Sequence, residues 1–209
     1  NFGKYKKAFS TNLYVDTKKF FSTQCIDKRQ FDIGYIGRFH EEKGILNILK
    51  SIKSIITHYP DIKIFIAGEG DLLYEITKQI EHDNIQNNVY LHQWISHTDL
   101  PKFLNQVKII LNPSIKEGLP NIILEAMACK TIVLATSVGA IPSIIKDGET
   151  GFIMEDNSPE CIAQNVIRAL NSPNLEMIAE NGRRLVERTY SFEKTVETWR
   201  RVFHHVLTL

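Results

Sequence analysis

The sequence is poor in cysteine and carries no excess of either charge. Its three cysteines, Cys25, Cys129 and Cys161, are far apart and form no C-x-x-C pair. This disfavours a zinc ribbon, a redox motif and a disulfide framework, and we expect reduced thiols in a cytoplasmic protein. The 25 basic and 24 acidic residues leave a net charge of +1. Duplex binders usually carry a strong basic excess, so nucleic acid is not expected as a partner.

Long apolar segments are absent as well. No apolar run approaches the ~20 residues of a membrane span, and nothing resembles a signal peptide. The chain begins with Asn1 rather than Met, so we expect it to be excised from a longer protein. Its 209 residues are enough for one sizeable core.

Short β-branched runs alternate with segments of helical period from about Phe31 onward. The expected strands cover 33–36, 62–67, 89–91, 109–111, 131–135 and 151–153. The expected helices begin at 45, 71, 99, 120 and 141, and a helical tail from Pro159 is interrupted near 172–173 and 190–191. This alternation predicts an α/β fold with a doubly wound, Rossmann-like parallel sheet. In such sheets ligands bind outside the carboxyl ends of the strands, so the loops after the strands are the candidate sites.

The loop after the first strand, 37–44, combines a glycine with two cations. Gly37 lets the chain turn sharply, and Arg38 offers a planar fork suited to phosphate oxygens. Lys43 adds a compact cation at the start of the next helix, so the two cations could hold a diphosphate. Two solvated surface cations are the alternative, and the spacing does not decide between them.

The loop after the second strand, 68–71, contains a Gly-x-Gly pattern, which is weak because turns need glycine anyway. Leu73 occupies the position of the third glycine of a dinucleotide fingerprint. A nicotinamide or flavin enzyme is correspondingly disfavoured.

The loop and helix start around Pro120 carry the most chemistry. Pro120 fits the first position of a helix, where its missing N–H costs nothing. The amides of Asn121 and Ile122 would then form an anion site at the positive end of the helix dipole. Glu117 before this helix and Glu125 on its second turn could each bind ligand hydroxyls. Two solvated acids are the alternative, and that alternative is the commoner situation for such a pair taken alone.

Two further features do not by themselves indicate a function. Gly139, in the loop 137–142, either lets the backbone approach a ligand or makes a tight turn. His92 and His97 do not have the spacing of metal ligands on one helix, and we expect them to be structural or solvated.

The loops together resemble the retaining glycosyltransferases of the GT-B fold, the "glycosyl transferases group 1" family. The resemblance is carried by Gly-Arg…Glu-Lys-Gly at 37–44, Gly-x-Gly at 68–70 and Pro-Ser…Glu-Gly-x-Pro-x5-Glu at 113–125. It covers roughly 33–156, with support from 147–152 and weaker support from 15–20. It implies the C-terminal half of a GT-B fold. Residues 1–21 would connect from an absent N-terminal domain, 22–190 would form the nucleotide-sugar-binding domain, and 191–209 would form a C-terminal helix.

The resemblance also implies roles by position. Arg38 and Lys43 would contact the donor diphosphate and stabilise the leaving phosphate, and Glu117 would face the transferred sugar. Glu125 would bind the ribose, and the base would lie near 90–91. The donor-binding set is Gly37, Arg38, Lys43, Gly68, Leu91, Gly118, Leu119, Asn121, Ile122 and Glu125. No metal is expected, because the cations and the helix dipole would take its place. No cofactor is expected either, since the UDP-, GDP- or ADP-sugar is a substrate.

The implied function is sugar transfer with retention of configuration in polysaccharide biosynthesis. The acceptor, a glycan or a lipid-linked molecule, would be held by the absent N-terminal domain, the intact enzyme could contact a membrane peripherally, and this fragment alone would be inactive. Gln93, Ala140 and Ser143 stand where the family often has Gly, Gly and Glu, which puts the identity of the donor in doubt. Two alternatives stay open: a sugar-nucleotide epimerase of GT-B architecture, and a non-catalytic nucleotide-binding module. A nicotinamide dehydrogenase ranks last.

Overall fold

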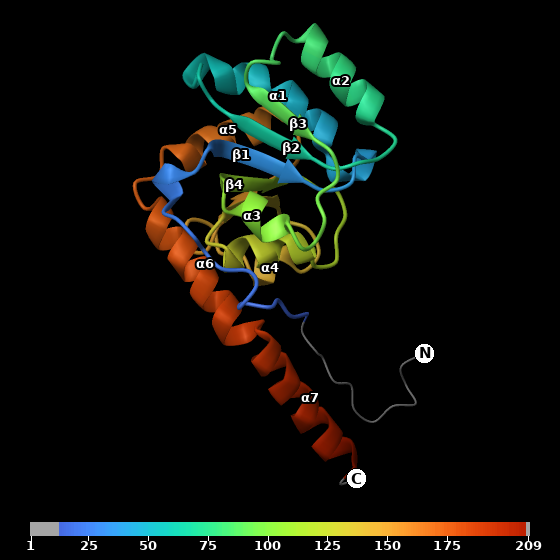
Figure 1. Ribbon diagram of the computed structural model, residues 1–209, viewed down its shortest axis with the longest axis vertical. Helices are drawn as coiled ribbons and strands as arrows, with labels where there is room; N and C mark the ends of the chain where they lie inside the picture. Colours follow the sequence, from blue (N-terminus) through green and yellow to red (C-terminus); the bar gives the residue numbers. More distant parts are fainter. Residues whose placement is uncertain (1–12, 208–209) are drawn as a thin grey trace.

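A computed structural model describes residues 13–207, which form a six-stranded parallel sheet with helices on both faces (Figure 1). The strands are β1 (Phe31–Ile36), β2 (Ile64–Ala67), β3 (Val89–His92), β4 (Val107–Asn112), β5 (Ile132–Thr136) and β6 (Phe152–Met154). Their order is β3-β2-β1-β4-β5-β6, and every neighbouring pair is parallel. The predicted doubly wound α/β sheet is confirmed. Its order reverses between β1 and β4, which is the place where open sheets of this kind bind ligands.

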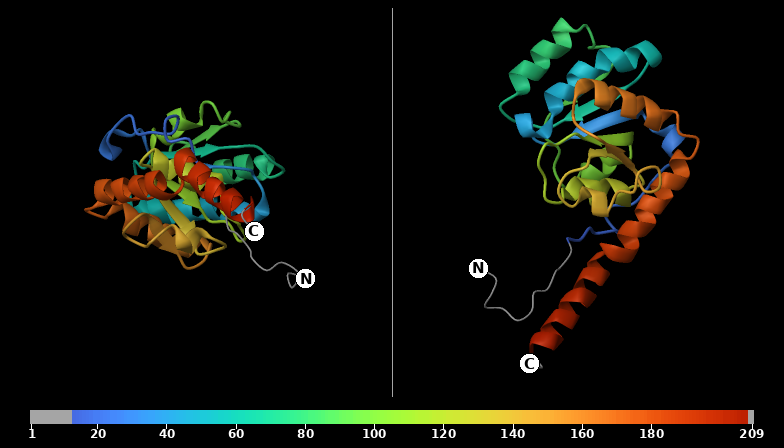
Figure 2. Two further views of the ribbon diagram at one scale, coloured as in Figure 1. Left: turned by 90° about the horizontal axis from the view of Figure 1, so that it is seen from below. Right: turned by 180° about the vertical axis from the view of Figure 1, so that it is seen from behind.

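The helices divide between the two faces of the sheet (Figures 1 and 2). Their bounds are α1 (Ile45–His58), α2 (Leu73–His82), α3 (Leu100–Leu104), α4 (Asn121–Ala128), α5 (Pro159–Leu170), α6 (Leu175–Thr189) and α7 (Phe192–Leu207). Helices α1, α2 and α5 pack together on one face, and α3, α4 and α6 lie on the other. Helix α7 runs on beyond the sheet (Figure 2). Among residues 13–207, no helix has the length and apolar character needed to cross a membrane.

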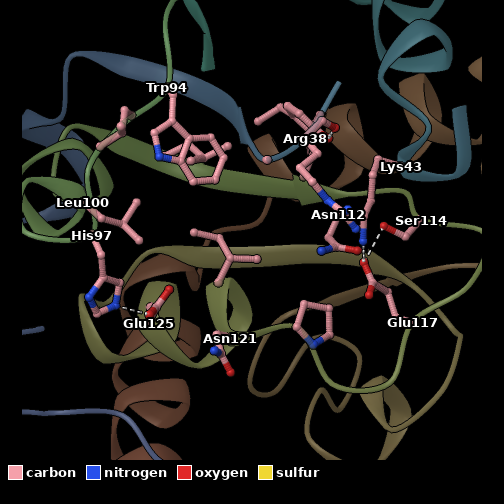
Figure 3. A pocket seen from close by; sticks show the side chains of 17 residues that line it. Arg38, Lys43, Trp94, His97, Leu100, Asn112, Ser114, Glu117, Asn121 and Glu125 are labelled. Carbon is pink, nitrogen blue, oxygen red and sulfur yellow. Dashed lines mark hydrogen bonds and ion pairs between the residues drawn. The ribbon is translucent and has the colours of Figure 1, made fainter. Parts of the chain in front are cut away.

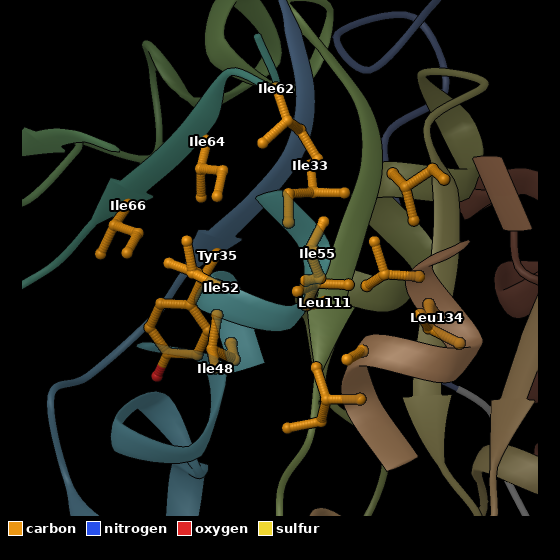
Figure 4. Packing of buried hydrophobic residues seen from close by; sticks show 14 of the residues in the cluster. Ile33, Tyr35, Ile48, Ile52, Ile55, Ile62, Ile64, Ile66, Leu111 and Leu134 are labelled. Carbon is orange, nitrogen blue, oxygen red and sulfur yellow. The ribbon is translucent and has the colours of Figure 1, made fainter. Parts of the chain in front are cut away.

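The core on the α1 face follows from the helical spacing of isoleucine and leucine. Ile45, Ile48, Leu49, Ile52 and Ile55 are each at most 1% exposed, because they share the stripe of α1 that faces the sheet. They meet isoleucines of β1 and β2 in one continuous cluster (Figure 4). Each such buried side chain stabilises the fold by about 1.5–3 kcal/mol relative to exposure.

A buried arginine joins the amino ends of three strands. Arg29, just before β1, is 4% exposed, and its guanidinium donates to the carbonyl of Val107 at 2.8 Å and to that of Cys129 at 2.8 Å. It also donates to the Thr131 hydroxyl at 2.7 Å. Burial lowers the pKa of Arg29 to about 10, so the group stays charged at neutral pH. These bonds fix the starts of β1, β4 and β5 at the edge opposite the carboxyl ends.

Three predicted element boundaries differ from the structure. Helix α2 begins at Leu73 rather than after Asp71, because the amide of Leu72 bonds to the carbonyl of Phe39. Pro120 is the N-cap of α4 with an extended backbone, not its first helical residue. The short helix expected over 141–146 is only the 3-10 turn η3 (Ile141–Ser143).

Of the predicted connection 1–21, residues 1–12 lie outside the described residues. The segment 13–20 is attached to the sheet domain at several points. The amide of Val15 donates to Tyr190, and Val15 forms a parallel bridge with Ser191 at the start of α7. The side chain of Phe20 is 1% exposed, and its carbonyl accepts a bond from Arg183 at 2.6 Å. The helical tail is interrupted where predicted, between α5 and α6 and between α6 and α7.

Candidate functional site

A cavity of about 550 Å³ lies at the carboxyl ends of β1 and β4, where the strand order reverses. Figure 3 shows charged side chains from the loops after β1 and β4 at one end of it, and Trp94, His97 and Leu100 at the other. The lining residues are Tyr35, Ile36, Gly37, Arg38, Lys43, Trp94, Ile95, His97, Leu100, Leu111, Asn112, Ser114, Glu117, Pro120, Asn121, Ile122 and Glu125. The position agrees with the rule for ligand sites in doubly wound sheets.

Buried groups fix the loop after β1. The hydroxyl of Tyr35 donates to the carbonyl of Arg38 at 2.6 Å, and burial raises the pKa of Tyr35, so this donor keeps its proton. Gly44 adopts a left-handed backbone with φ of 71°. A Cβ atom there would lie 2.5 Å from the carbonyl oxygen of Pro113. Glycine therefore lets this loop lie directly against the loop after β4.

That close approach pairs Lys43 with Glu117. The Lys43 ammonium lies 2.5 Å from Oε1 of Glu117, and the two side chains are only 18% and 12% exposed. The Ser114 hydroxyl donates to the same oxygen at 2.9 Å. Arg38 is exposed beside this pair and has no acidic partner within salt-bridge distance among residues 13–207. One cation is thus held in place, and a second is available to an anion in the cavity.

The start of α4 contributes backbone donors and a buried carboxylate. The amides of Asn121 and Ile122 belong to the first turn of α4, where they have no acceptor within the helix. Glu125, one turn on, is 7% exposed. Among the described residues its carboxylate accepts a single hydrogen bond, from Nε2 of His97 at 2.8 Å. A buried carboxylate needs further donors to offset its lost hydration, which a ligand with hydroxyl groups would supply.

The opposite end of the cavity is more apolar. Trp94, in the loop after β3, is 52% exposed and turns its ring toward the cavity (Figure 3). The buried side chains of Ile95 and Leu100 also line the cavity. Asn112, at the end of β4, is 8% exposed, and its Oδ1 has no hydrogen-bond partner among residues 13–207. The cavity therefore has an apolar surface at one end and unused hydrogen-bonding capacity near its charged end.

Most of the predicted site residues line this one cavity. Gly37, Arg38, Lys43, Glu117, Asn121, Ile122 and Glu125 are among them. Gly68 is not: a Cβ there would lie 1.9 Å from the carbonyl oxygen of Gly37, so this glycine allows two loops to touch. Leu91 is exposed on β3, and neither Gly118 nor Leu119 lines the cavity. The carbonyl of Gly118 instead accepts the amide of Ala140, which ties the loop after β4 to the loop after β5.

Sequence reasoning missed several lining residues, of which His97 is the most informative. It was expected to be structural or solvated, yet it hydrogen-bonds to Glu125. Trp94, Asn112 and Ser114 also line the cavity without having been singled out. All three residues follow the carboxyl end of a predicted strand, which is the feature of the sequence that could have identified them as site residues. Within the part of the chain that the structure describes, no group of three or more His, Cys, Asp or Glu side chains could hold a metal ion.

Comparison with known proteins identifies related chains and domains. The chain is 34% identical to the capsular polysaccharide biosynthesis glycosyltransferase CapM of Staphylococcus aureus, over 77% of this chain and 42% of the relative. It is 28% identical to the poly(ribitol-phosphate) alpha-N-acetylglucosaminyltransferase of the same species, over 82% of this chain and 35% of the relative. The chain thus spans less than half the length of these relatives.

Solved structures agree with this relationship. The C-terminal domain of a glycosyl transferase group 1 family protein (LpcC) from Francisella tularensis superimposes with a TM-score of 0.75 at 28% identity, covering 85% of this chain and 99% of that domain. The fold is therefore that of the C-terminal, Rossmann-like domain of a GT-B glycosyltransferase. The family model "Glycosyl transferases group 1" matches residues 16–185. The chain belongs to the glycosyl transferases group 1 family.

Proposed function

We propose that this chain is the donor-binding half of a glycosyltransferase that takes a sugar from a nucleoside-diphosphate sugar and transfers it with retention of configuration. The observation that carries the proposal is the two-ended cavity at the strand-order switch. Cations and free helix amides lie at one end of it, and an aromatic surface with a buried carboxylate lies at the other. A nucleoside-diphosphate sugar has matching parts: a charged diphosphate and sugar, then a ribose and a flat base.

The diphosphate would lie between Arg38, Lys43 and the start of α4. Arg38 would donate its planar fork to phosphate oxygens, and Lys43, held by Glu117, would supply a fixed positive charge. The Asn121 and Ile122 amides would bind further oxygens with the help of the helix dipole. These groups would stabilise the negative charge that develops on the leaving phosphate, which is how preorganised sites lower a barrier.

The two carboxylates would bind hydroxyl groups. Glu125, which has one hydrogen bond from His97, would accept hydrogen bonds from the ribose hydroxyls. Lys43 and Ser114 both contact Oε1 of Glu117, so its Oε2 would be the oxygen that faces the transferred sugar, with Gly118 and Leu119 supplying nearby backbone. Both carboxylates act here as hydrogen-bond acceptors, not as an acid–base couple.

The base would lie at the aromatic end. The half-exposed ring of Trp94 offers a flat face for stacking, and Leu91 is an exposed side chain on β3, the strand that precedes the Trp94 loop. Stacking on an aromatic side chain is worth about 1–3 kcal/mol per base.

We further propose that no metal or cofactor takes part and that the enzyme works in the cytoplasm. Arg38, Lys43 and the dipole of α4 would neutralise the diphosphate without a metal. The free thiols of Cys25, Cys129 and Cys161 are compatible with a reducing compartment. A glycan or lipid-linked acceptor would be bound by a part of the protein outside this chain, so the chain alone would bind donor but turn over poorly. The names of relatives, such as poly(ribitol-phosphate) alpha-N-acetylglucosaminyltransferase, support sugar transfer as the reaction class.

Calorimetric titration of the 209-residue chain with UDP-, GDP- and ADP-sugars tests the proposal. We expect one donor class to bind, and Arg38→Ala to weaken that binding about tenfold or more, since it removes a charge-assisted phosphate contact. Lys63→Ala, an exposed cation at the amino end of β2, is the matched control and should leave affinity unchanged. A folded chain that binds none of the three donors would overturn the proposal. Formation of a donor epimer without acceptor by the full-length protein would replace transfer with epimerisation.

A further inference from the structure

A chain of two hydrogen bonds links the segment 13–20 to the buried carboxylate of the cavity. The ammonium of Lys19 lies 3.2 Å from Nδ1 of His97. The other ring nitrogen of His97, Nε2, lies 2.8 Å from Oε1 of Glu125. The three residues come from three separate parts of the chain: the segment before β1, the loop after β3, and α4.

The chemistry of these groups fixes the direction of both bonds. A lysine ammonium has only donors, so Nδ1 of His97 must accept from Lys19. The proton of the neutral imidazole then resides on Nε2, which donates to Glu125. Lys19 thus selects the tautomer of His97 that can bind a carboxylate. Oε1 of Glu125 is thereby occupied, and Oε2 is left for a ligand.

The His97 side chain depends on its contact with Lys19 because little of it is buried. Its side chain is 65% exposed, and an exposed side chain loses rotamer freedom when it is fixed in one geometry. The ring of Phe20 packs against the imidazole with centroids 5.3 Å apart. Phe20 is itself 1% exposed, and Oδ1 of Asp16 accepts the amide of Lys19 at 3.2 Å. Segment 13–20 therefore contacts His97 through two residues, Lys19 and Phe20.

We propose that His97 is a positioning residue of the donor site: it orients the Glu125 carboxylate toward the ribose hydroxyls, and Lys19 makes that orientation depend on the segment 13–20. The proposal rests on the proposed function, because it assigns ribose hydroxyls to Glu125. It adds a residue outside the predicted set, and it couples the position of a segment on the outer surface of the domain to donor affinity. His97 acts through Glu125 and does not itself contact the donor.

Paired nucleotides test this directly. The wild-type chain is titrated by calorimetry with UDP, GDP and ADP, and the one that binds is compared with its 2′,3′-dideoxy analogue. We expect His97→Ala to weaken binding of the ribonucleotide about tenfold, the usual effect of losing a hydrogen bond to a charged group. Affinity for the dideoxy analogue should change less than twofold, because that ligand has no hydroxyls for Glu125 to accept.

Two further variants separate positioning from packing. His97→Gln should restore affinity to within about threefold of wild type, since its Nε2 amide can donate to Glu125 from a similar place. Lys19→Met should weaken ribonucleotide binding by a smaller factor, about threefold. It should leave the affinity for the dideoxy analogue unchanged. Thermal unfolding of each variant shows whether the fold is intact.

Equal loss of affinity for the ribonucleotide and its dideoxy analogue in His97→Ala would overturn positioning and indicate a direct contact or a packing defect. No effect of His97→Ala on either ligand would overturn it as well. If the wild-type chain is folded and binds none of the three nucleotides, the proposed function fails first, and this inference fails with it.

Discussion

Replacing Lys43 by methionine isolates the charge that holds Glu117 in the cavity. The two groups are 2.5 Å apart, and their side chains are 18% and 12% exposed. Methionine keeps most of the length and the apolar stem of lysine. The substitution therefore removes the ion pair while disturbing the surrounding packing little.

The expected magnitude follows from opposing effects. At an effective dielectric constant of about 20, unit charges at this separation attract by about 7 kcal/mol. Removing both groups from water costs several kcal/mol each, so the net contribution of the intact pair is near zero. In Lys43→Met, however, Glu117 keeps its desolvation cost and only the Ser114 hydroxyl still donates to it. We expect a loss of about 3 kcal/mol in the free energy of unfolding.

Glu117→Gln should lower the free energy of unfolding by less, about 1 kcal/mol, because the flexible stem of Lys43 can turn its ammonium toward water. Once Lys43 is already methionine, the neutral glutamine removes the unpaired buried charge. The double variant should therefore be about 2 kcal/mol more stable than the sum of the single losses predicts.

Urea denaturation followed by far-ultraviolet circular dichroism measures all four chains at pH 7. Lys130→Met is the matched control, because its pair with Glu180 has a similar separation of 2.6 Å but side chains about one-third exposed. It should cost under about 1 kcal/mol. Single losses that add to within about 0.5 kcal/mol in the double variant would refute the reasoning, since independent sites behave in that way.

Two other perturbations give separate checks of the structure. Gly139→Ala should destabilise the chain by more than about 2 kcal/mol, because φ is 56° and the new Cβ would lie 2.2 Å from the carbonyl oxygen of Glu117. Gly148→Ala, with φ of 72° and no atom within 4 Å, should cost only about 1 kcal/mol in the same urea assay, and equal losses would contradict the close approach. Burial raises the pKa of the Asp83 carboxyl, but hydrogen bonds from Lys53, Gln79 and His82 outweigh it and bring the pKa to about 2, below its ordinary 3.8. The stabilisation from Asp83 is thus present above pH 3.8 and lost as the pH falls toward 2, so the stability difference between wild type and Asp83→Asn should shrink over that range; a difference independent of pH would be inconsistent with this.

Local periodicity was sufficient to predict the order of the elements. The apolar stripe from Ile45 to Ile55 is the buried face of α1, because a helix that covers a sheet must present one side to it. The boundaries depended on longer-range contacts. Helix α2 begins where Phe39, more than thirty residues away, accepts an amide. Proline is preferred at the first helical position, but its fixed φ is compatible with the N-cap as well, so the preference predicted the wrong one of two adjacent positions for Pro120.

The site was predictable where its residues follow strands and unpredictable where they depend on partners far along the chain. Arg38 and Glu125 belong to loops and helix starts that a parallel sheet brings to one edge. His97 gains its role only from Lys19 and Glu125, which lie 78 and 28 residues away. The close contact between Gly68 and the carbonyl of Gly37 could not be predicted from the sequence either, and the role of Gly68 in donor binding stays a prediction.

The position of Arg29 bears on how readily such a domain could be redesigned. Its bonds to Val107, Cys129 and Thr131 secure the strands at the edge remote from the cavity. Loops at the cavity edge can then be exchanged between relatives while this anchorage stays intact. Grafting the loop after β3, which carries Trp94, from a relative that uses another donor class is therefore a route to new nucleotide specificity in which the scaffold itself needs no change.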